Sequence, residues 1–169
     1  MNRTVHEHLP AILNGVAGVV VLALSFLVEF RMPLPKDLAK LLGLLLIGLG
    51  MGLAIWASVY IKSAIMGEVE PRLKILVRQG PYRFVRHPVY LGMTIALIGA
   101  TVALRSWAGL IGVFVLFLPS VIYRAQLEDK ALLRKFGDEW ANYAAQTGFI
   151  LPFIGKVKRS DLISPSARI

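Results

Sequence analysis

The chain has 169 residues, of which 56% are hydrophobic, and it carries a formal net charge of +9. Its mean hydropathy of +0.65 excludes an ordinary soluble domain of this length, because one small core could not bury so much apolar surface. The absence of cysteine excludes disulfides, thiolate metal sites and cysteine nucleophiles. No nucleic-acid-binding motif accompanies the positive charge, which basic loops beside anionic lipid headgroups explain.

Apolar runs in the sequence predict an all-α fold: one polytopic membrane domain over residues 1–169 with about four transmembrane helices. The first two runs are long enough for a hydrocarbon core that needs about 20 helical residues. The last two are shorter, and only Arg105 and Ser106 separate them. We interpret this pair as a helical hairpin that is either fully spanning or re-entrant. The predicted spans are 11–30, 41–61, 89–104 and 107–123.

Basic residues are distributed unequally between the two sides of these spans. Fifteen Lys and Arg residues lie before the first span, in the loop 62–87 or after Tyr123, whereas four lie on the opposite side. The positive-inside rule therefore predicts that both termini and the long loop face the cytoplasm. If the source is bacterial, the membrane is the inner (plasma) membrane.

Small residues and proline modify two of the predicted helices. Gly48 and Gly52 are four residues apart, which predicts a face that lets another helix approach closely, within the chain or in a second copy. Pro119 has no amide hydrogen, so we expect a kink there and a carbonyl at Val115 without its helical donor.

The stretch GPYRFVRHPVY, residues 80–90, joins the second and third spans. Gly80 and Pro81 predict a turn. Pro88 suits the first turn of a helix that continues as the third span, which puts His87 at the cap position.

The same stretch has the side chains of a ligand site. Arg83 and Arg86 lie near the free amides of a helix start, a combination that favours an anion such as a carboxylate or phosphate. Tyr82, Phe84 and Tyr90 offer flat surfaces for an aromatic ring. Each residue alone is typical of a lipid interface, but their combination in eleven positions favours a binding site.

A cytoplasmic helical region is predicted over residues 124–154, where apolar residues recur at mostly helical spacing. Gly137 is expected to end one helix and Asp138 to cap the next. Glu128 and Asp129 place two carboxylates near the bilayer exit, where they either form surface salt bridges or bind a cationic group. Residues 157–169 are predicted to form a polar tail.

The motifs LVRQGPYRFVRHPVYLG and RAQLEDKALLRKFGDEWANYAAQTGFILPFIGKVK together resemble the isoprenylcysteine carboxyl methyltransferase superfamily, which includes related bacterial and phospholipid methyltransferases of the membrane. The resemblance covers residues 76–158. It implies methyl transfer from S-adenosylmethionine, held in a cytoplasm-facing pocket within the loop 76–91, to a lipophilic or membrane-associated acceptor. S-adenosylhomocysteine would be the product, and no metal is implied.

The resemblance also implies site residues by position. Glu128 would hold the amino end of the methionine moiety, and Asp129 stands where many members have a second Glu. Arg86 and Arg124 are expected to steer an anionic acceptor, which makes Arg86, Arg124 and Glu128 the catalytic candidates. The implied cofactor-binding residues are Leu76, Val77, Gly80, Tyr82, His87, Tyr90, Leu91, Glu128 and Asp129.

Several alternatives stay open from the sequence. An isoprenylcysteine-type carboxylate is the favoured acceptor, while a lipid amine or a small thiol is also compatible. The stretch FGDEWANY is similar to the C-terminal pattern of NADPH-dependent membrane reductases of the sterol reductase type. A non-catalytic four-span protein is the third reading. The lipid bilayer is the expected partner, and the oligomeric state is open.

Overall fold

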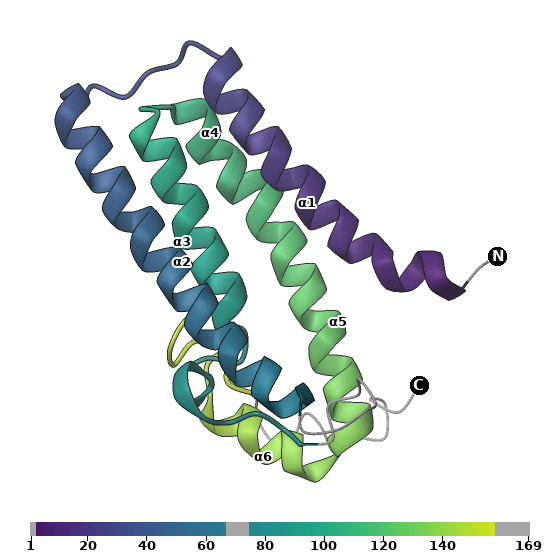
Figure 1. Ribbon diagram of the computed structural model, residues 1–169. Helices are drawn as coiled ribbons and strands as arrows, with labels where there is room; N and C mark the ends of the chain where they lie inside the picture. The colour runs from purple at the N-terminus through teal and green to yellow at the C-terminus, as the bar shows by residue number, and fades with distance from the viewer. Residues whose placement is uncertain (1–2, 67–74, 158–169) are drawn as a thin grey trace. The chain divides into compact units, whose positions relative to one another are not determined.

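The computed structural model describes residues 3–66 and 75–157, and these residues are almost entirely helical (Figure 1). Within these two ranges no strand occurs beyond isolated bridges, so the predicted all-α class is confirmed. Residues 158–169 of the predicted tail lie outside the described residues. The elements are α1 (Arg3–Leu27), α2 (Lys36–Met66), the 3-10 turn η1 (Gly80–Arg83), α3 (Pro88–Ala103), α4 (Trp107–Gly112), the π-helical segment η2 (Val113–Phe117), α5 (Leu118–Phe136) and α6 (Asp138–Gln146).

Three helical stretches of the described chain are long and apolar enough to cross a membrane: Leu9–Leu27, Lys36–Ile61 and Trp107–Phe136. They correspond to the predicted spans 11–30, 41–61 and 107–123. The fourth predicted span, 89–104, forms α3, which has 16 residues. At 1.5 Å per residue α3 is about 24 Å long, shorter than a hydrocarbon core of about 30 Å. Three candidate spans are therefore established, and a fourth is not.

The chain divides into two compact units. The first contains Met1–Gly52 and Gly92–Leu127, and the second contains Leu53–Leu91 and Glu128–Ile169. The single domain expected from the sequence stays a prediction.

In the first unit α3 and α4 form a helical hairpin, as predicted. Ser106 caps α4 by accepting a hydrogen bond from the amide of Gly109 at 3.0 Å. Gly109 also lies against α1, since a Cβ on it would fall 1.9 Å from the Ser25 hydroxyl oxygen. The hairpin therefore packs on α1 through a position that only glycine can occupy.

Helices α2 and α3 approach each other through glycine in the first unit, but not through the predicted pair. A Cβ on Gly50 would lie 2.4 Å from the Ala96 amide nitrogen, and one on Gly43 would lie 2.5 Å from the Ala103 Cβ. Gly48 and Gly52 have nothing within 4 Å of such a Cβ. The prediction of a Gly48–Gly52 contact within the chain is thus wrong. Gly43 and Gly50 are two helical turns apart and share the face that meets α3.

Before Pro119, where the sequence predicts a kink, the chain forms the π-helical segment η2. The amide of Leu118 donates to the carbonyl of Val113, five residues earlier, in place of the usual four. Such a local widening accommodates a proline that has no amide hydrogen to donate.

In the second unit the end of α5 and α6 cover the segment that precedes η1. The predicted break at Gly137 is present, with a left-handed φ of 52°. Asp138 is the first residue of α6 and not its cap, because Gly137 occupies the cap position. Residues after Gln146 form a loop where the sequence predicted a helical region to 154. The core contains Leu76, Leu132, Leu133, Phe136, Trp140, Tyr143, Ala144 and Val157.

Candidate functional site

His87 lies between two carboxylates in the second unit. It directly precedes α3, as predicted from Pro88, and its side chain is buried. Its Nε2 is 2.9 Å from Oδ1 of Asp129, and its Nδ1 is 3.6 Å from Oε2 of Glu128. Because Glu128 and Asp129 are adjacent on α5, one helix supplies a carboxylate to each ring nitrogen.

Aromatic side chains fix the orientation of the His87 imidazole. Tyr90, one turn into α3, stacks on it with ring centroids 5.7 Å apart, and its hydroxyl donates to Oε1 of Glu128. Phe149 meets the imidazole edge-on, with centroids 5.2 Å apart. These two ring contacts and the hydrogen bond of Nε2 to Asp129 leave the imidazole little freedom to rotate.

Asp129 and Glu128 differ in what remains available to a ligand. The Asp129 side chain is 12% exposed and uses both oxygens within the protein, one toward His87 and one toward Arg86. The Glu128 side chain is 41% exposed although Tyr90 and His87 lie beside it. Glu128 is therefore the more solvent-exposed of the two carboxylates.

Arg86 is enclosed by acceptors from the C-terminal part of the chain. Its Nε donates to Oδ2 of Asp129 at 3.2 Å. Its Nη1 donates to the carbonyls of Ala144 and Thr147 at 3.0 and 2.9 Å, and its Nη2 donates to the carbonyl of Gly155 at 2.9 Å. The side chain is 3% exposed. Its polar groups are thus satisfied by the protein itself.

The backbone before α3 is bound to the same C-terminal segment. The amide of Arg86 donates to the carbonyl of Gly148 at 2.8 Å, and the amide of His87 donates to that of Phe149 at 3.2 Å. The Gly148 amide in turn donates to the carbonyl of Phe84. These two amides, which directly precede α3, are therefore not available to an anion.

The loop before η1 is held by packing and by buried phenols. Gly80 has φ 58°, and a Cβ on it would lie 2.5 Å from the ring of Tyr60. The hydroxyl of Tyr143 donates to the carbonyl of Tyr82 at 2.8 Å. Burial raises the pKa of both Tyr82 and Tyr143 well above the ordinary phenol value, so both stay protonated at physiological pH.

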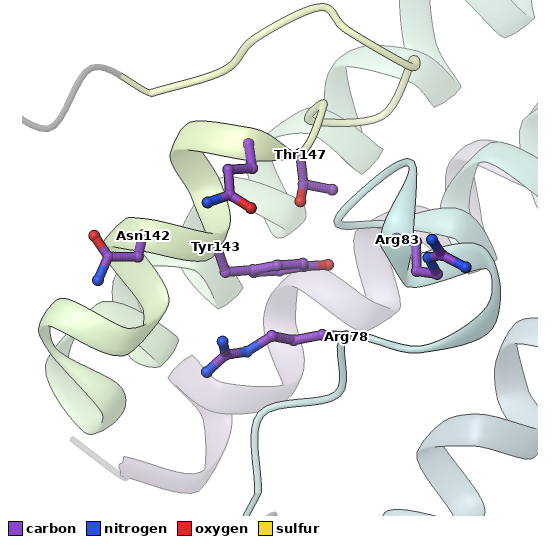
Figure 2. A pocket seen from close by; sticks show the side chains of 6 residues that line it. Arg78, Arg83, Asn142, Tyr143 and Thr147 are labelled. Carbon is purple, nitrogen blue, oxygen red and sulfur yellow. The ribbon is translucent and has the colours of Figure 1, made fainter.

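A separate polar pocket of about 410 Å³ lies on the second unit (Figure 2). Arg78 pairs with Glu139 on α6, and the ring of Tyr143 forms part of the wall. None of the residues implied by the family resemblance lines this pocket. Its lining residues are Arg78, Arg83, Asn142, Tyr143, Gln146 and Thr147.

The structure thus brings five of the predicted site residues into one network, which we call the imidazole network: Arg86, His87, Tyr90, Glu128 and Asp129. Leu76, Val77, Gly80, Tyr82 and Leu91 belong to the same unit, whereas Arg124 belongs to the first unit, one turn before Glu128 on α5. Over residues 3–66 and 75–157 no cluster of three or more metal-ligating side chains occurs.

Sequence reasoning missed Phe149 and the carbonyls of Ala144, Thr147 and Gly155. These groups act through a ring edge and through backbone oxygens. No residue type marks such a carbonyl, so the sequence carried no signal for these partners of Arg86.

Over its described residues the chain is all-helical and has three candidate spans. Two neighbouring carboxylates hold an imidazole beside the start of an apolar helix. Comparison with known proteins identifies the class of membrane protein that has these features. A model of the phospholipid methyltransferase family matches residues 38–139, more than half of the chain. The chain belongs to the phospholipid methyltransferase family.

Characterised relatives are methyltransferases. The chain is 36% identical over 77 residues to methanethiol S-methyltransferase of Pseudomonas deceptionensis, covering 42% of this chain and 26% of that protein. It is 30% identical over 129 residues to protein-S-isoprenylcysteine O-methyltransferase of Saccharomyces cerevisiae, covering 74% of this chain and 54% of that protein. The chain thus spans about half, or less, of the length of these relatives.

A solved structure has the same fold. The eukaryotic intramembrane Ras methyltransferase, isoprenylcysteine carboxyl methyltransferase, matches with a TM-score of 0.58 and 24% identity, over 94% of this chain and 56% of that one. The resemblance inferred from the two sequence motifs is therefore confirmed.

Proposed function

We propose that the chain transfers a methyl group from S-adenosylmethionine to a lipophilic or membrane-associated acceptor. The observation that carries the proposal is the imidazole network, in which a half-exposed carboxylate, Glu128, is fixed by His87 and Tyr90 beside the start of an apolar helix. The family membership supports the same reaction class.

The residues of the network fit a ligand that carries positive charge. Glu128 provides an anionic oxygen on the exposed side, suited to the amino group of the methionine moiety. The stacked rings of His87 and Tyr90 offer a polarisable surface next to that carboxylate. A sulfonium group is cationic as well, so the carboxylate and the rings suit both positive charges of the cofactor.

Within this proposal, Glu128 binds the cofactor and Asp129 is a positioning residue. Asp129 holds His87 and Arg86 with its two oxygens and has little exposed surface. Arg86 is likewise a positioning residue, since its side chain is only 3% exposed and its guanidinium already donates four hydrogen bonds within the protein. We therefore propose that Arg124, on α5, attracts an anionic acceptor, and we no longer assign this role to Arg86.

When bound, the cofactor would supply an electrophilic methyl group, which would pass to the acceptor as its carbon–sulfur bond breaks and S-adenosylhomocysteine leaves. The chain contributes alignment and the exclusion of water, and alignment of reacting groups is worth roughly 7–11 kcal/mol. A carboxylate or thiolate acceptor needs no base. An amine must first lose a proton, and His87 or a carboxylate of the network is the group proposed to accept it.

The acceptor that we favour is an isoprenylcysteine-type carboxylate, as in the yeast relative's name; a small thiol, as in the Pseudomonas relative's name, and a lipid amine are the alternatives. Incubating membranes that contain the protein with methyl-labelled cofactor, followed by identification of the labelled product, decides between them. A labelled ester, thioether or amine identifies the respective acceptor.

Calorimetric titration of the detergent-purified protein tests the cofactor assignment. We expect S-adenosylhomocysteine to bind and NADPH not to bind. The variant Glu128→Gln should raise the Kd roughly tenfold to a hundredfold, because a charge-assisted hydrogen bond is lost.

The control is Glu139→Gln, which removes a surface carboxylate of the same type that pairs with Arg78. It should leave the Kd unchanged. Binding of NADPH alone would instead identify a reductase, and binding of neither ligand would favour a non-catalytic protein.

A further inference from the structure

The segment after α6 is an ordered loop that returns to the start of α3 (yellow in Figure 1). The amide of Phe149 donates to the carbonyl of Ile154 at 2.7 Å, which closes a six-residue turn. Farther along, the amide of Val157 donates to the carbonyl of Ala144 at 3.3 Å. The loop therefore has a defined conformation.

This turn exposes three apolar side chains, which we call the apolar tip: Leu151, Phe153 and Ile154. They are 49%, 78% and 62% exposed, respectively. Phe153 has φ 65°, a conformation that a bulky residue seldom adopts, and it is nonetheless the most exposed of the three. The backbone of the turn thus holds these apolar side chains on the surface, although contact between apolar side chains and water is unfavourable.

The apolar tip lies close to the point where the chain enters an apolar helix. Its base is bonded to the backbone of Arg86 and His87, directly before Pro88 of α3. No residue of a closed six-residue turn is more than three residues from its base, so the tip reaches at most about 10 Å from it. The headgroup layer on each side of a bilayer is roughly 5–8 Å thick. The tip is therefore within reach of that layer.

A positive charge accompanies the apolar tip. The ammonium of Lys156 lies 5.4 Å from the centroid of the Phe153 ring. Aromatic side chains with a neighbouring Lys are typical of the bilayer interface, where the ring contacts lipid and the ammonium contacts anionic headgroups. The apolar side chains and the positive charge therefore both suit contact with an anionic lipid surface.

We propose that the apolar tip is a lipid-contact surface that inserts into the headgroup layer of the membrane in which the protein resides. The loop that carries the tip also supplies the Thr147 and Gly155 carbonyls to Arg86. Insertion therefore fixes the C-terminal side of the imidazole network to the bilayer. This inference does not depend on methyl transfer.

Site-directed spin labelling tests the insertion, and the chain has no cysteine that would interfere. The variant Phe153→Cys carries a nitroxide in vesicles of phosphatidylcholine and phosphatidylglycerol. Its relaxation by oxygen, which concentrates in lipid, is compared with that by a water-soluble nickel complex. Leu49→Cys, exposed on α2 within a candidate span, is the lipid reference, and Asn142→Cys, exposed on α6, is the water reference.

We expect the Phe153 label to have an oxygen-to-nickel accessibility ratio between those of the two references, and well above that of Asn142. A ratio equal to that of Asn142 overturns the proposal. Low accessibility to both reagents also overturns it, because a protein surface would then cover the tip. The variant Ile154→Cys repeats the measurement, so that a folding defect of one variant does not decide the result.

Discussion

Arg86 donates four hydrogen bonds to other parts of the protein. Replacing it by Met leaves Asp129 without its arginine partner and removes the guanidinium hydrogen bonds of three carbonyls. We expect the free energy of unfolding to fall by about 3–5 kcal/mol, because one partner of a buried ion pair is removed. Arg86→Lys should recover part of this loss, since one ammonium cannot reach all four acceptors.

Unfolding of the detergent-solubilised variants, followed by fluorescence, measures this difference. Arg83→Met is the matched control, because Arg83 is exposed three residues earlier in the same segment. If Arg86→Met is no less stable than Arg83→Met, Arg86 does not hold the C-terminal loop.

The buried phenols of Tyr82 and Tyr143 make stability sensitive to alkaline pH. Burial raises their pKa in the folded state above the value of about 10 that holds in the unfolded chain. Their contribution to stability is therefore complete below pH 10 and is lost as the pH rises above it, at about 1.4 kcal/mol per pH unit and group. Tyr143→Phe should reduce the slope of stability against pH above 10. An unchanged slope in denaturation series from pH 8 to 11 contradicts this assignment.

Single residues also show where sequence reasoning succeeds. Pro88 and Gly137 were placed correctly, because a proline at a helix start and a glycine at a helix end act on their own backbone. The role of Arg86 was not predictable in this way. Its partners lie 43 to 69 residues farther along the chain, and three of them are backbone oxygens.

At the scale of elements, the close approach of α2 and α3 depends on Gly50. The change Gly50→Ala places a methyl group 2.4 Å from the Ala96 amide nitrogen, so the helices must separate. We expect a loss of about 1–3 kcal/mol in the free energy of unfolding, as for other overpacked contacts. Titration with a denaturing detergent measures it.

Gly48→Ala is the matched control on the same helix, because nothing lies within 4 Å of its added Cβ. It should be neutral or slightly stabilising. Equal effects of the two substitutions would mean that α2 and α3 do not meet through Gly50.

The contact between α2 and α3 also shows what glycine spacing in a sequence cannot predict. The sequence presents Gly43, Gly48, Gly50 and Gly52 on one apolar helix, and the familiar four-residue spacing selected the wrong pair. Hydropathy is high all around this helix, so it does not indicate which face meets another helix. That choice depends on Ala96 and Ala103, which belong to a partner helix some fifty residues away.

At the scale of the whole molecule, the charge distribution predicts one orientation in the membrane. A membrane-impermeant maleimide should label Lys36→Cys in intact cells or spheroplasts, because this exposed residue lies on the side with few basic residues. Asn142→Cys should react only after permeabilisation. The reverse labelling pattern would place the imidazole network on the outer side.

Apolar runs and turn signals were enough to predict the helical class, three of the four proposed spans and the hairpin between α3 and α4. They were not enough to predict two compact units, or a loop in place of helix after Gln146. Hydropathy reports transfer into lipid, whereas these features arise from contacts between distant segments.

The long sequence separation within the Arg86 contacts has a consequence for biosynthesis. The carbonyls that bind its guanidinium come from residues 58, 61 and 69 positions later, so they leave the ribosome well after α3 has formed. Until then the newly made arginine must remain hydrated at the membrane surface. Synthesis of residues 144–155, and not the threading of the apolar segments into lipid, is thus the step that allows the hydrogen bonds around Arg86 to form.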